Sequence, residues 1–374
     1  MATIPHAHPH SAGSSPAGHH RFDVDFGQTP LLVIWEVTRS CELACLHCRA
    51  DAMPQRHPQE LDLDEGRRLI DEVADMGTPL IIFSGGDPLQ REDLEELVRH
   101  AKGRDLRVGT IPATTGRLTR ERMASLQAAG VDQMALSIDG ETAAKHDAFR
   151  QVPGSFAKAM QGAAWAAELG VPLQVNTVFG AWNVDDFAAL SALVESLNVV
   201  FWEVFFLVPT GRGTALQGCT AEQFEQLFEK LYALTQRVSF VVKITEGQHY
   251  RRYMAQRHAA DPGRAVRQRM PRVAVNAGRG ICFVDHTGVI SPSGFLPVPC
   301  GSVRDVSLAE TYRGHPVFTA LRDVDRLEGP CGICDYREVC GGGSRARAYG
   351  MTGQLHAPEP CCTYGQQLTV AREA

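Results

Sequence analysis

The chain has 374 residues, of which 44% are hydrophobic and 21% charged, a composition that can bury a sizeable core and suggests two domains. Its net charge of −6 argues against a general nucleic-acid-binding surface. No apolar run approaches the roughly 18 residues of a membrane span, and the N-terminus lacks the basic start and apolar stretch of a signal peptide. We therefore expect a cytoplasmic protein with neither a nucleic-acid nor a membrane partner.

Eleven cysteines are many for a chain without an export signal. In a reducing compartment they favour metal binding or catalysis over a disulfide framework. Most fall into an early and a late group: Cys41, Cys45 and Cys48, then Cys331, Cys334, Cys340, Cys361 and Cys362. Cys219, Cys282 and Cys300 lie between the two groups.

Residues 1–27 are rich in His, Pro, Ser and Gly. A segment of this composition cannot bury enough surface to fold alone. We expect a disordered leader there, with a metal-binding tail as the alternative because five histidines fall within its first 20 residues.

From residue 31 the chain alternates short apolar runs with amphipathic helical stretches. The runs are rich in Val, Ile, Leu and Phe, which predicts parallel strands covered on both faces. They span Leu31–Val37, Leu80–Ser84, Leu106–Ala113, Gln133–Asp139, Pro172–Phe179 and Val200–Val208. About six β/α units in series predict an α/β fold, a partial (β/α)6 barrel over residues 28–217. Such architectures bind ligands at the carboxyl ends of their strands.

Cys41, Cys45 and Cys48 form a CxxxCxxC pattern directly after the first predicted strand. Soft thiolates favour an iron–sulfur cluster, zinc or Cu(I). A four-iron cluster needs four ligands and this loop offers three, so one iron would stay open to a small molecule. Half of a zinc site is the alternative.

The ends of the later strands carry small and polar groups that suit a ligand. Glycines after the second strand let the backbone approach a ligand closely, although an ordinary βα turn has the same sequence. Hydroxyl and amide groups that suit ribose hydroxyls follow the next strands. An arginine suited to bidentate carboxylate pairing follows the fourth strand, with a surface arginine as the alternative. The candidate ligand-binding residues are Gly85, Gly86, Asp87, Thr115, Ser137, Asp139, Arg150 and Asn176.

The early cysteine loop resembles that of the radical S-adenosylmethionine (radical SAM) superfamily. His47 replaces the aromatic residue common before the third cysteine. The resemblance implies a partial barrel in which Cys41, Cys45 and Cys48 hold a 4Fe–4S cluster. The open iron of that cluster would bind the amino and carboxylate groups of S-adenosylmethionine.

The turn Gly85–Pro88 resembles the GGEP element of the same superfamily, with Asp87 in place of the usual Glu. That element binds the methionyl amine of S-adenosylmethionine. The resemblance further implies that the hydroxyl and amide groups at the later strand ends contact the ribose and methionyl parts, and that Arg150 lies near the ligand carboxylate.

Residues 218–277 form a bridging segment, with a helix predicted around Ala221–Leu234 and a strand near Ser239–Ile244. A basic helical stretch follows from about Gln248 to Arg272. Its arginines form a solvated charged face or dock the carboxylates of an acidic substrate or partner. They are Arg251, Arg252, Arg257, Arg264, Arg267, Arg269 and Arg272.

Residues 278–374 open with a predicted hairpin at Gly278–Gly288. Cys331, Cys334, Cys340 and a later cysteine follow. Four thiolates at this spacing can complete a zinc site or a fully ligated four-iron cluster.

Together with the early loop, this last region resembles the SPASM extension of radical SAM enzymes, which carries auxiliary clusters. The resemblance assigns Cys331, Cys334, Cys340 and Cys362 to one auxiliary 4Fe–4S cluster, and Cys361 is the other candidate for the last place.

A second auxiliary cluster is left open by the same resemblance. Cys282 and Cys300 lie near positions that such a cluster uses, but Ser344 replaces another of its cysteines. We therefore expect one auxiliary cluster.

Within the superfamily, Phe295–Pro297, Gly301–Arg304 and Cys340–Tyr349 resemble the heme-pathway subgroup. That subgroup implies oxidative decarboxylation of tetrapyrrole propionates in heme biosynthesis, begun by hydrogen abstraction by a 5′-deoxyadenosyl radical. It also implies a one-electron donor such as flavodoxin or ferredoxin. Arg345 and Arg347 would suit propionates or support the auxiliary-cluster loop.

Two other functions remain as alternatives. One is a radical SAM/SPASM maturase that modifies a ribosomal peptide or protein. The other, of a different class, is a non-catalytic protein that binds structural zinc through both cysteine groups.

Overall fold

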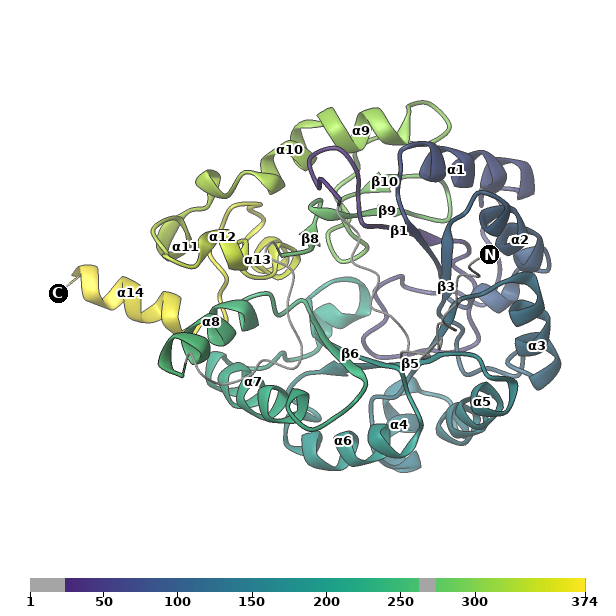
Figure 1. The fold of residues 1–374 in the computed structure, drawn as a ribbon, viewed down its shortest axis with the longest axis horizontal. Coiled ribbons are helices and arrows are strands. Elements are labelled where there is room, and N and C mark those ends of the chain that lie inside the picture. Colours follow the sequence, from purple (N-terminus) through teal and green to yellow (C-terminus); the bar gives the residue numbers. More distant parts are fainter. Residues whose placement is uncertain (1–23, 262–273, 374) are drawn as a thin grey trace, which may run out of the picture.

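The computed structural model describes residues 24–261 and 274–373. Across these ranges the strands form one ten-stranded sheet in the order β10-β9-β1-β2-β3-β4-β5-β6-β7, with β8 beside β9. Neighbouring strands from β9 through β7 are parallel, and β10 runs antiparallel to β9. The sheet curves into an open barrel with helices around its outside (Figure 1). Positions 1–23 of the expected leader lie outside the described residues, as do Arg264, Arg267, Arg269 and Arg272.

The six apolar runs form the first six strands, within a few residues of their predicted bounds. Val33 and Trp35 of β1 are fully buried because helices cover the outer face of the sheet. The strands are β1 (Leu32–Glu36), β2 (Leu80–Ser84), β3 (Arg107–Thr110), β4 (Gln133–Ser137), β5 (Leu173–Phe179), β6 (Phe201–Phe206), β7 (Val241–Thr245), β8 (Asn276–Ala277), β9 (Gly280–Val284) and β10 (Ile290–Ser291).

The helices of the barrel follow their strands in turn, and α1, α3 and α4 begin at side-chain N-caps. In α1, Asp62 and Glu65 form a reciprocal capping box, which satisfies two backbone N–H groups at the start of the helix. The barrel helices are α1 (Leu63–Asp75), α2 (Leu94–Gly103), α3 (Arg120–Ala129), α4 (Ala143–Arg150), α5 (Ser155–Leu169) and α6 (Phe187–Ser196). Those of the bridging and C-terminal segments are α7 (Ala221–Thr235), α8 (Tyr250–Ala260), α9 (Leu308–Gly314), α10 (Pro316–Arg322), α11 (Gly329–Gly332), α12 (Arg337–Cys340), α13 (Arg345–Thr352) and α14 (Thr363–Glu373).

Two segments outside the predicted barrel extend its sheet. The strand expected in the bridging segment is β7, which pairs in parallel with β6. The expected hairpin forms from β9 and β10, although β10 (Ile290–Ser291) lies just beyond the predicted bounds. Strand β9 also pairs in parallel with β1, with Ile281 opposite Leu32. A short apolar run shows that a strand forms and not which strand lies beside it, so the sequence did not predict this pairing.

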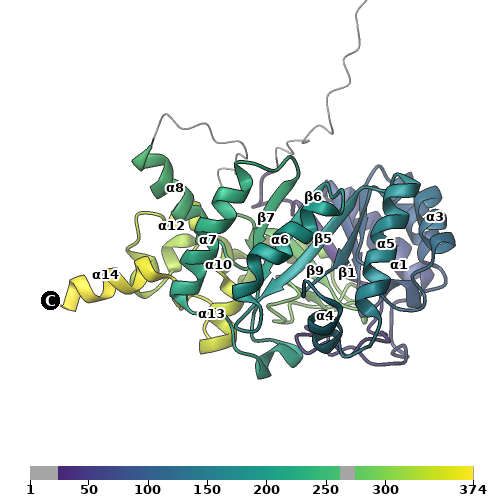
Figure 2. The same ribbon diagram turned by 90° about the horizontal axis from the view of Figure 1, so that it is seen from below.

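The C-terminal region bridges the two sides of the open barrel. Arg347 Nε of α13 donates to the carbonyl of Leu207, just after β6, over 3.3 Å. On the other side, Asn276 Nδ2 of β8 donates to the carbonyl of Gly343 over 2.8 Å. Both views show α12 and α14 gathered with α7 and α8 at one end of the molecule (Figures 1 and 2).

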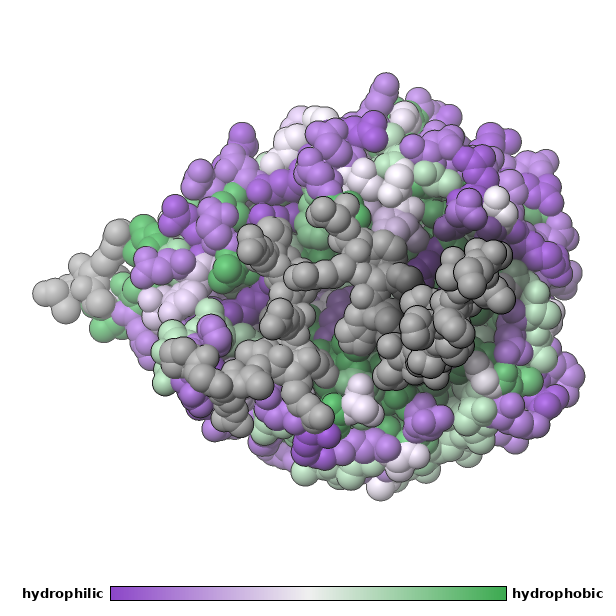
Figure 3. All heavy atoms as spheres, in the orientation of Figure 1, coloured by the Kyte–Doolittle hydropathy of each residue, from purple (hydrophilic) through white to green (hydrophobic). Residues whose placement is uncertain are grey.

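The outer rim of the molecule is mostly hydrophilic in the view of Figure 3, and hydrophobic residues lie nearer the middle of that face. Helices α1, α2 and α3 turn charged side chains outward and bury a hydrophobic stripe, as amphipathic helices around a sheet do. None of the helices in the described ranges combines the length and apolar character that a membrane crossing needs.

Candidate active site

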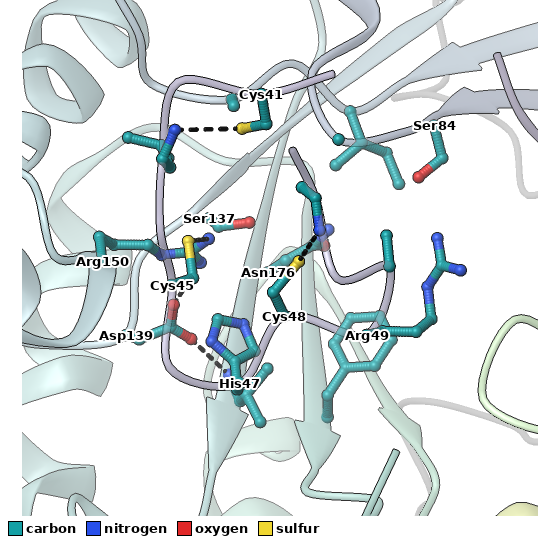
Figure 4. Close-up of a pocket in the computed structure, with 18 of the residues that line it drawn as sticks. Cys41, Cys45, His47, Cys48, Arg49, Ser84, Ser137, Asp139, Arg150 and Asn176 are labelled. Atoms are coloured by element: carbon teal, nitrogen blue, oxygen red, sulfur yellow. Dashed lines mark hydrogen bonds and ion pairs between the residues drawn. The ribbon is translucent and has the colours of Figure 1, made fainter. Parts of the chain in front are cut away.

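A cavity of about 190 Å³ lies where the parallel strands end at their carboxyl side. Segments far apart in the sequence meet there because a β/α repeat brings every strand end to the same rim. Figure 4 shows the thiols of the early cysteine loop around this space. The lining includes Cys41, Cys45, His47, Cys48, Arg49, Ser84, Gly85, Gly86, Ser137, Asp139, Arg150, Asn176, Phe205, Leu207, Val208 and Phe295.

Each thiol of the early group accepts a hydrogen bond from an N–H group (Figure 4). A backbone N–H donates to Cys41 Sγ over 3.3 Å, and another donates to Cys48 Sγ over 3.4 Å. Arg150 Nη1 donates to Cys45 Sγ over 3.5 Å. Burial raises the pKa of the Cys41 thiol to about 12, and coordination to a metal deprotonates a thiol outright. The donors therefore suit thiolates that become charged when they bind a cluster.

The turn after β6 holds the cysteine loop in place. Arg212 Nε donates to the carbonyl of Cys45 over 2.9 Å, and the backbone N–H of Arg212 donates to that of Cys48 over 3.0 Å. Sequence reasoning missed the role of this turn, because backbone carbonyls that accept hydrogen bonds leave no sequence pattern.

Positions 85 and 86 require glycine, because the backbone of the β2 turn packs directly against the backbone that leads into the cysteine loop. A Cβ at Gly86 would lie 2.4 Å from the carbonyl oxygen of Ser40, and one at Gly85 would lie 2.6 Å from that of Thr38. The N–H of Gly86 donates to the Thr38 carbonyl over 2.8 Å. The two glycines thus place the β2 turn beside the cysteine loop, and both line the cavity.

Asp87 and Thr115 lie behind the cavity wall, although the sequence predicted that both contact a ligand. Asp87 is fully buried and accepts hydrogen bonds from Thr115 Oγ1 at 2.8 Å and from the backbone N–H of Ala113 at 3.2 Å. Burial raises the pKa of Asp87 to about 6. Ala113 lines the cavity, so Asp87 shapes the wall through its neighbours.

Asp139 and Arg150 form a buried ion pair beside Cys45. Burial alone would raise the pKa of Asp139, but the Arg150 guanidinium holds it below its ordinary value. The backbone N–H of Asp139 donates to His146 Nδ1 over 3.2 Å, and burial lowers the pKa of His146 to about 4. The charge of Arg150 is therefore compensated within the protein, and its contact with a ligand carboxylate stays a prediction.

Ser137, the last residue of β4, and Asn176, in the middle of β5, lie side by side as direct register partners. Both line the cavity. Asn176 Oδ1 accepts a hydrogen bond from Gln174 Nε2 over 2.6 Å, which fixes the orientation of its amide. Their predicted contacts with ribose or methionyl groups stay predictions.

His47 is held in a stack of aromatic rings. Its ring lies 4.6 Å from that of Phe149 at an angle of 15°, and Phe149 stacks in turn on Trp182 at 4.7 Å. Burial lowers the pKa of His47 to about 4. The imidazole is thus a neutral, flat part of the cavity wall at pH 7.

The sequence missed an apolar wall on one side of the cavity. Phe205 lies near the end of β6, Leu207 and Val208 follow that strand, and Phe295 comes from the C-terminal region. The rings of Phe205 and Phe295 lie 6.0 Å apart. Apart from Glu203, β6 and the residues directly after it are apolar, so composition alone does not tell which of them face the interior.

A second pocket brings together Cys331, Cys334, Cys340 and Cys362. Backbone N–H groups donate to the first three thiols over 3.5, 3.4 and 3.2 Å. Cys361 is turned away, since its thiol donates to a backbone carbonyl 3.7 Å away and packs against the main core. The structure therefore places Cys362, and not Cys361, with the other three thiols.

Neither cysteine group forms a site for a single metal ion. Within the described ranges, no group of three or more His, Cys, Asp and Glu side chains is arranged to hold one. The thiols instead line pockets, each with N–H donors, and thiolates are the usual protein ligands of a cluster of several irons. Both donor sets fit iron–sulfur clusters.

Arg345 and Arg347 do not reach the cavity, so the suggestion that they bind propionates is wrong. Arg345 is 1% exposed and donates to the carbonyl of Ala357 over 2.7 Å. Arg347 is 3% exposed and pairs with both oxygens of Glu359 at 3.1 Å. Both arginines support the chain around the second pocket, which is the other role that the sequence allowed.

The part of the basic stretch that the structure describes also pairs internally. Arg252 forms an ion pair with Glu225, and Arg257 Nη2 lies 3.3 Å from Glu229 Oε1. Both carboxylates belong to α7, so these two arginines join α8 to α7.

Cys282 and Cys300 pack into the main hydrophobic core. Burial raises the pKa of both thiols, that of Cys300 to about 11. Ser344 accepts the backbone N–H of Arg347 over 2.9 Å and caps α13. These contacts give the three residues structural roles in the fold.

Comparison with known proteins agrees with this geometry. A sequence profile of the radical SAM superfamily matches residues 35–194. The AdoMet-dependent heme synthase of Nitratidesulfovibrio vulgaris is 40% identical over 361 residues, which cover 94% of this chain and 97% of that protein. The chain belongs to the radical SAM superfamily.

More distant radical SAM relatives share the architecture. The PqqA peptide cyclase of Rhodopseudomonas palustris is 30% identical over 348 residues, covering 89% of this chain and 86% of that protein. The structure of Streptococcus suis SuiB bound to its precursor peptide SuiA superimposes with a TM-score of 0.69 over 90% of this chain and 76% of that chain, at 14% identity. That likeness shows the fold alone.

Membership makes this protein an iron–sulfur enzyme that uses a 4Fe–4S cluster and S-adenosylmethionine. The early thiols, the glycine turn and the polar strand ends meet in one cavity, as a cluster with a small organic ligand requires. The non-catalytic zinc protein is therefore excluded.

Proposed function

We propose that this radical SAM enzyme oxidatively decarboxylates propionate side chains of an iron tetrapyrrole in heme biosynthesis. The observation that supports this most strongly is the 40% identity to an AdoMet-dependent heme synthase over nearly the full length of both chains. The net change would remove one hydrogen atom, one electron and CO₂ from a propionate and leave a vinyl group.

In this proposal the two cysteine groups have separate roles. Cys41, Cys45 and Cys48 hold the cluster that binds S-adenosylmethionine, and the residues of the second pocket hold an auxiliary cluster. When bound, the first cluster and S-adenosylmethionine supply hydrogen-atom abstraction from an unactivated carbon. The auxiliary ligands are Cys331, Cys334, Cys340 and Cys362.

The cavity residues orient the ligands and exclude water. Gly85 and Gly86 bring backbone groups to the methionyl end, and Ser137 and Asn176 offer polar groups to the ribose. The apolar wall at Phe205 and Phe295 suits the flat, hydrophobic face of a macrocycle. A site closed by such a wall keeps water from a reactive species.

We further propose that residues 28–217 form the radical SAM core, 218–277 the bridging segment and 278–374 the auxiliary-cluster domain. A small one-electron carrier such as flavodoxin or ferredoxin would supply the reducing electron.

A peptide maturase is the second candidate, because the PqqA peptide cyclase is 30% identical over most of this chain. The lower identity makes a peptide substrate the weaker proposal.

Anaerobic conversion assays test the proposal. Reconstituted, reduced enzyme with S-adenosylmethionine should convert iron coproporphyrin into products that have lost the mass of formic acid per propionate, as mass spectrometry would show. The Cys45→Ala variant should give no conversion. Unchanged porphyrin, together with cross-linking of a candidate peptide, would favour the maturase instead.

A further inference from the structure

Arg49 places a guanidinium in the wall of the active-site cavity. Its side chain is 18% exposed, whereas that of Arg150 is 10% exposed and already contacts both Asp139 and Cys45. Figure 4 shows Arg49 on the side of the cavity away from Arg150 and Asp139. The Arg49 guanidinium thus lies on the side of the cavity opposite the buried ion pair and is the more exposed of the two.

Arg49 is anchored by the buried residue Glu36, which in turn contacts the buried residue His286. Arg49 Nη2 lies 2.9 Å from Glu36 Oε2, and Glu36 Oε1 lies 2.8 Å from His286 Nδ1. Glu36 is the last residue of β1 and is 3% exposed. Although burial would raise its pKa, Arg49 and His286 hold the pKa of Glu36 below its ordinary value. The carboxylate therefore stays charged and anchors the guanidinium.

The hydrophobic surroundings of Arg49 restrict its side chain further. Its guanidinium carbon lies 4.7 Å from the centre of the Phe283 ring, a cation–π contact. A Cβ added to Gly294 would lie 3.0 Å from Arg49 Nη1, so the side chain runs along the turn that carries Phe295. Arg49 is therefore packed between the cysteine loop and the apolar wall.

We propose that Arg49 binds a carboxylate of the substrate while the apolar wall contacts the body of the same molecule. This inference rests on the proposed function and adds to it a specificity-determining residue for a propionate-bearing macrocycle. Glu36 holds one nitrogen of the Arg49 guanidinium, and Phe283 packs against its face. The remaining N–H groups can form a bidentate pair with a carboxylate. S-adenosylmethionine also carries a carboxylate, and the test separates the two sources.

The test compares ligands with and without carboxylates. Absorbance titrations of the anaerobic, reconstituted enzyme would give dissociation constants for iron coproporphyrin and for its neutral propionamide derivative. A separate titration would give the dissociation constant of S-adenosylmethionine. Arg49→Met should weaken iron coproporphyrin binding roughly ten- to a hundredfold. It should leave the affinities for the propionamide and for S-adenosylmethionine unchanged.

Matched variants control for damage to the neighbouring cluster. Arg49→Lys keeps the positive charge but loses the planar guanidinium that can donate two parallel hydrogen bonds. It should therefore lose less affinity for iron coproporphyrin than Arg49→Met. Arg117→Met removes an exposed arginine that approaches Glu42 of the cysteine loop at 3.6 Å and should behave as wild type. The iron and sulfide contents of all variants should match those of the wild type. If Arg49→Met loses the cluster, Arg49→Lys takes its place in the comparison.

Three outcomes would overturn the inference. Equal weakening of the acid and the propionamide would show a structural role, and weaker S-adenosylmethionine binding alone would assign Arg49 to the cofactor. Unchanged porphyrin binding by both Arg49 variants would overturn the inference and leave the proposed function standing. Failure of the wild-type enzyme to bind or convert the porphyrin would overturn both.

Discussion

Arg150 joins the cysteine loop to the barrel, because Nη1 donates to the Cys45 thiol over 3.5 Å and Nη2 pairs with the buried carboxylate of Asp139. The two partners contact different nitrogens of the guanidinium and are far apart in the sequence. One arginine thus compensates a buried carboxylate and donates to a thiol of the cluster-binding loop.

Arg150→Met should destabilise the protein strongly, because it leaves Asp139 charged and buried without its partner. Removing one partner of a buried pair costs about 3–5 kcal/mol, and chemical denaturation of the cluster-free protein would measure the loss. Adding Asp139→Asn to the same chain should restore part of the stability. Arg120→Met, which breaks an exposed pair with Glu168, should have no measurable effect. Equal stability of Arg150→Met and Arg120→Met would contradict the prediction.

Gly86→Ala should disturb the active site, because the new Cβ would lie 2.4 Å from the Ser40 carbonyl oxygen and 2.7 Å from that of Arg39. Neither backbone can move without shifting the cysteine loop. We expect weaker S-adenosylmethionine binding and less iron retained on the early group, measured by isothermal titration and iron analysis. Gly103→Ala is the matched control, since nothing lies within 4 Å of its Cβ. A Gly86→Ala protein with normal iron content and cofactor affinity would count against this role.

The barrel and the two cysteine groups could be predicted from sequence because their physical signals are local. A strand buried on both faces must be apolar throughout, and a loop that wraps a cluster must carry its thiols at short spacing. The carboxyl-end rule then placed Ser137 and Asn176 correctly in the cavity wall.

The remainder depended on contacts that leave no local signal. Asp87 stands beside the two glycines, and nothing in its spacing shows that its side chain turns away from the cavity. Arg345 and Arg347 look like carboxylate binders in the sequence, but both are buried, Arg345 against backbone carbonyls and Arg347 against Glu359. Arg49 follows Cys48 directly, yet its anchor depends on Glu36 and on His286, which lies 250 residues beyond Glu36 in the chain.

The last ligand of the auxiliary cluster should be distinguishable by single substitutions. Cys362→Ala should lower the iron content by one cluster, because its thiol lies in the pocket with the other three. Cys361→Ala should retain all of the iron, since that thiol packs against the core instead. Iron and sulfide analysis with electron paramagnetic resonance of the reduced proteins would measure both. Iron loss from Cys361→Ala alone would reverse the assignment.

His146 should make the cluster-free protein less stable in mild acid. Burial lowers its pKa from 6.5 to about 4 in the folded state, so below pH 6.5 the unfolded chain binds a proton there that the folded chain does not. Stability from this residue is therefore complete above pH 6.5 and is lost as the pH falls towards 4, by about 3 kcal/mol. Protonation would also remove the acceptor for the Asp139 N–H.

The His146→Gln variant isolates this contribution, because its amide oxygen can still accept the Asp139 N–H and it does not titrate. Between pH 7.5 and 4.5 at the same ionic strength, the denaturation midpoint of the wild type should fall further than that of the variant, since only the wild type loses the contribution of His146. Other buried histidines, such as His47 and His249, are present in both proteins and cancel in the difference. Parallel pH profiles for the two proteins would show that His146 titrates at its ordinary pKa in the folded chain.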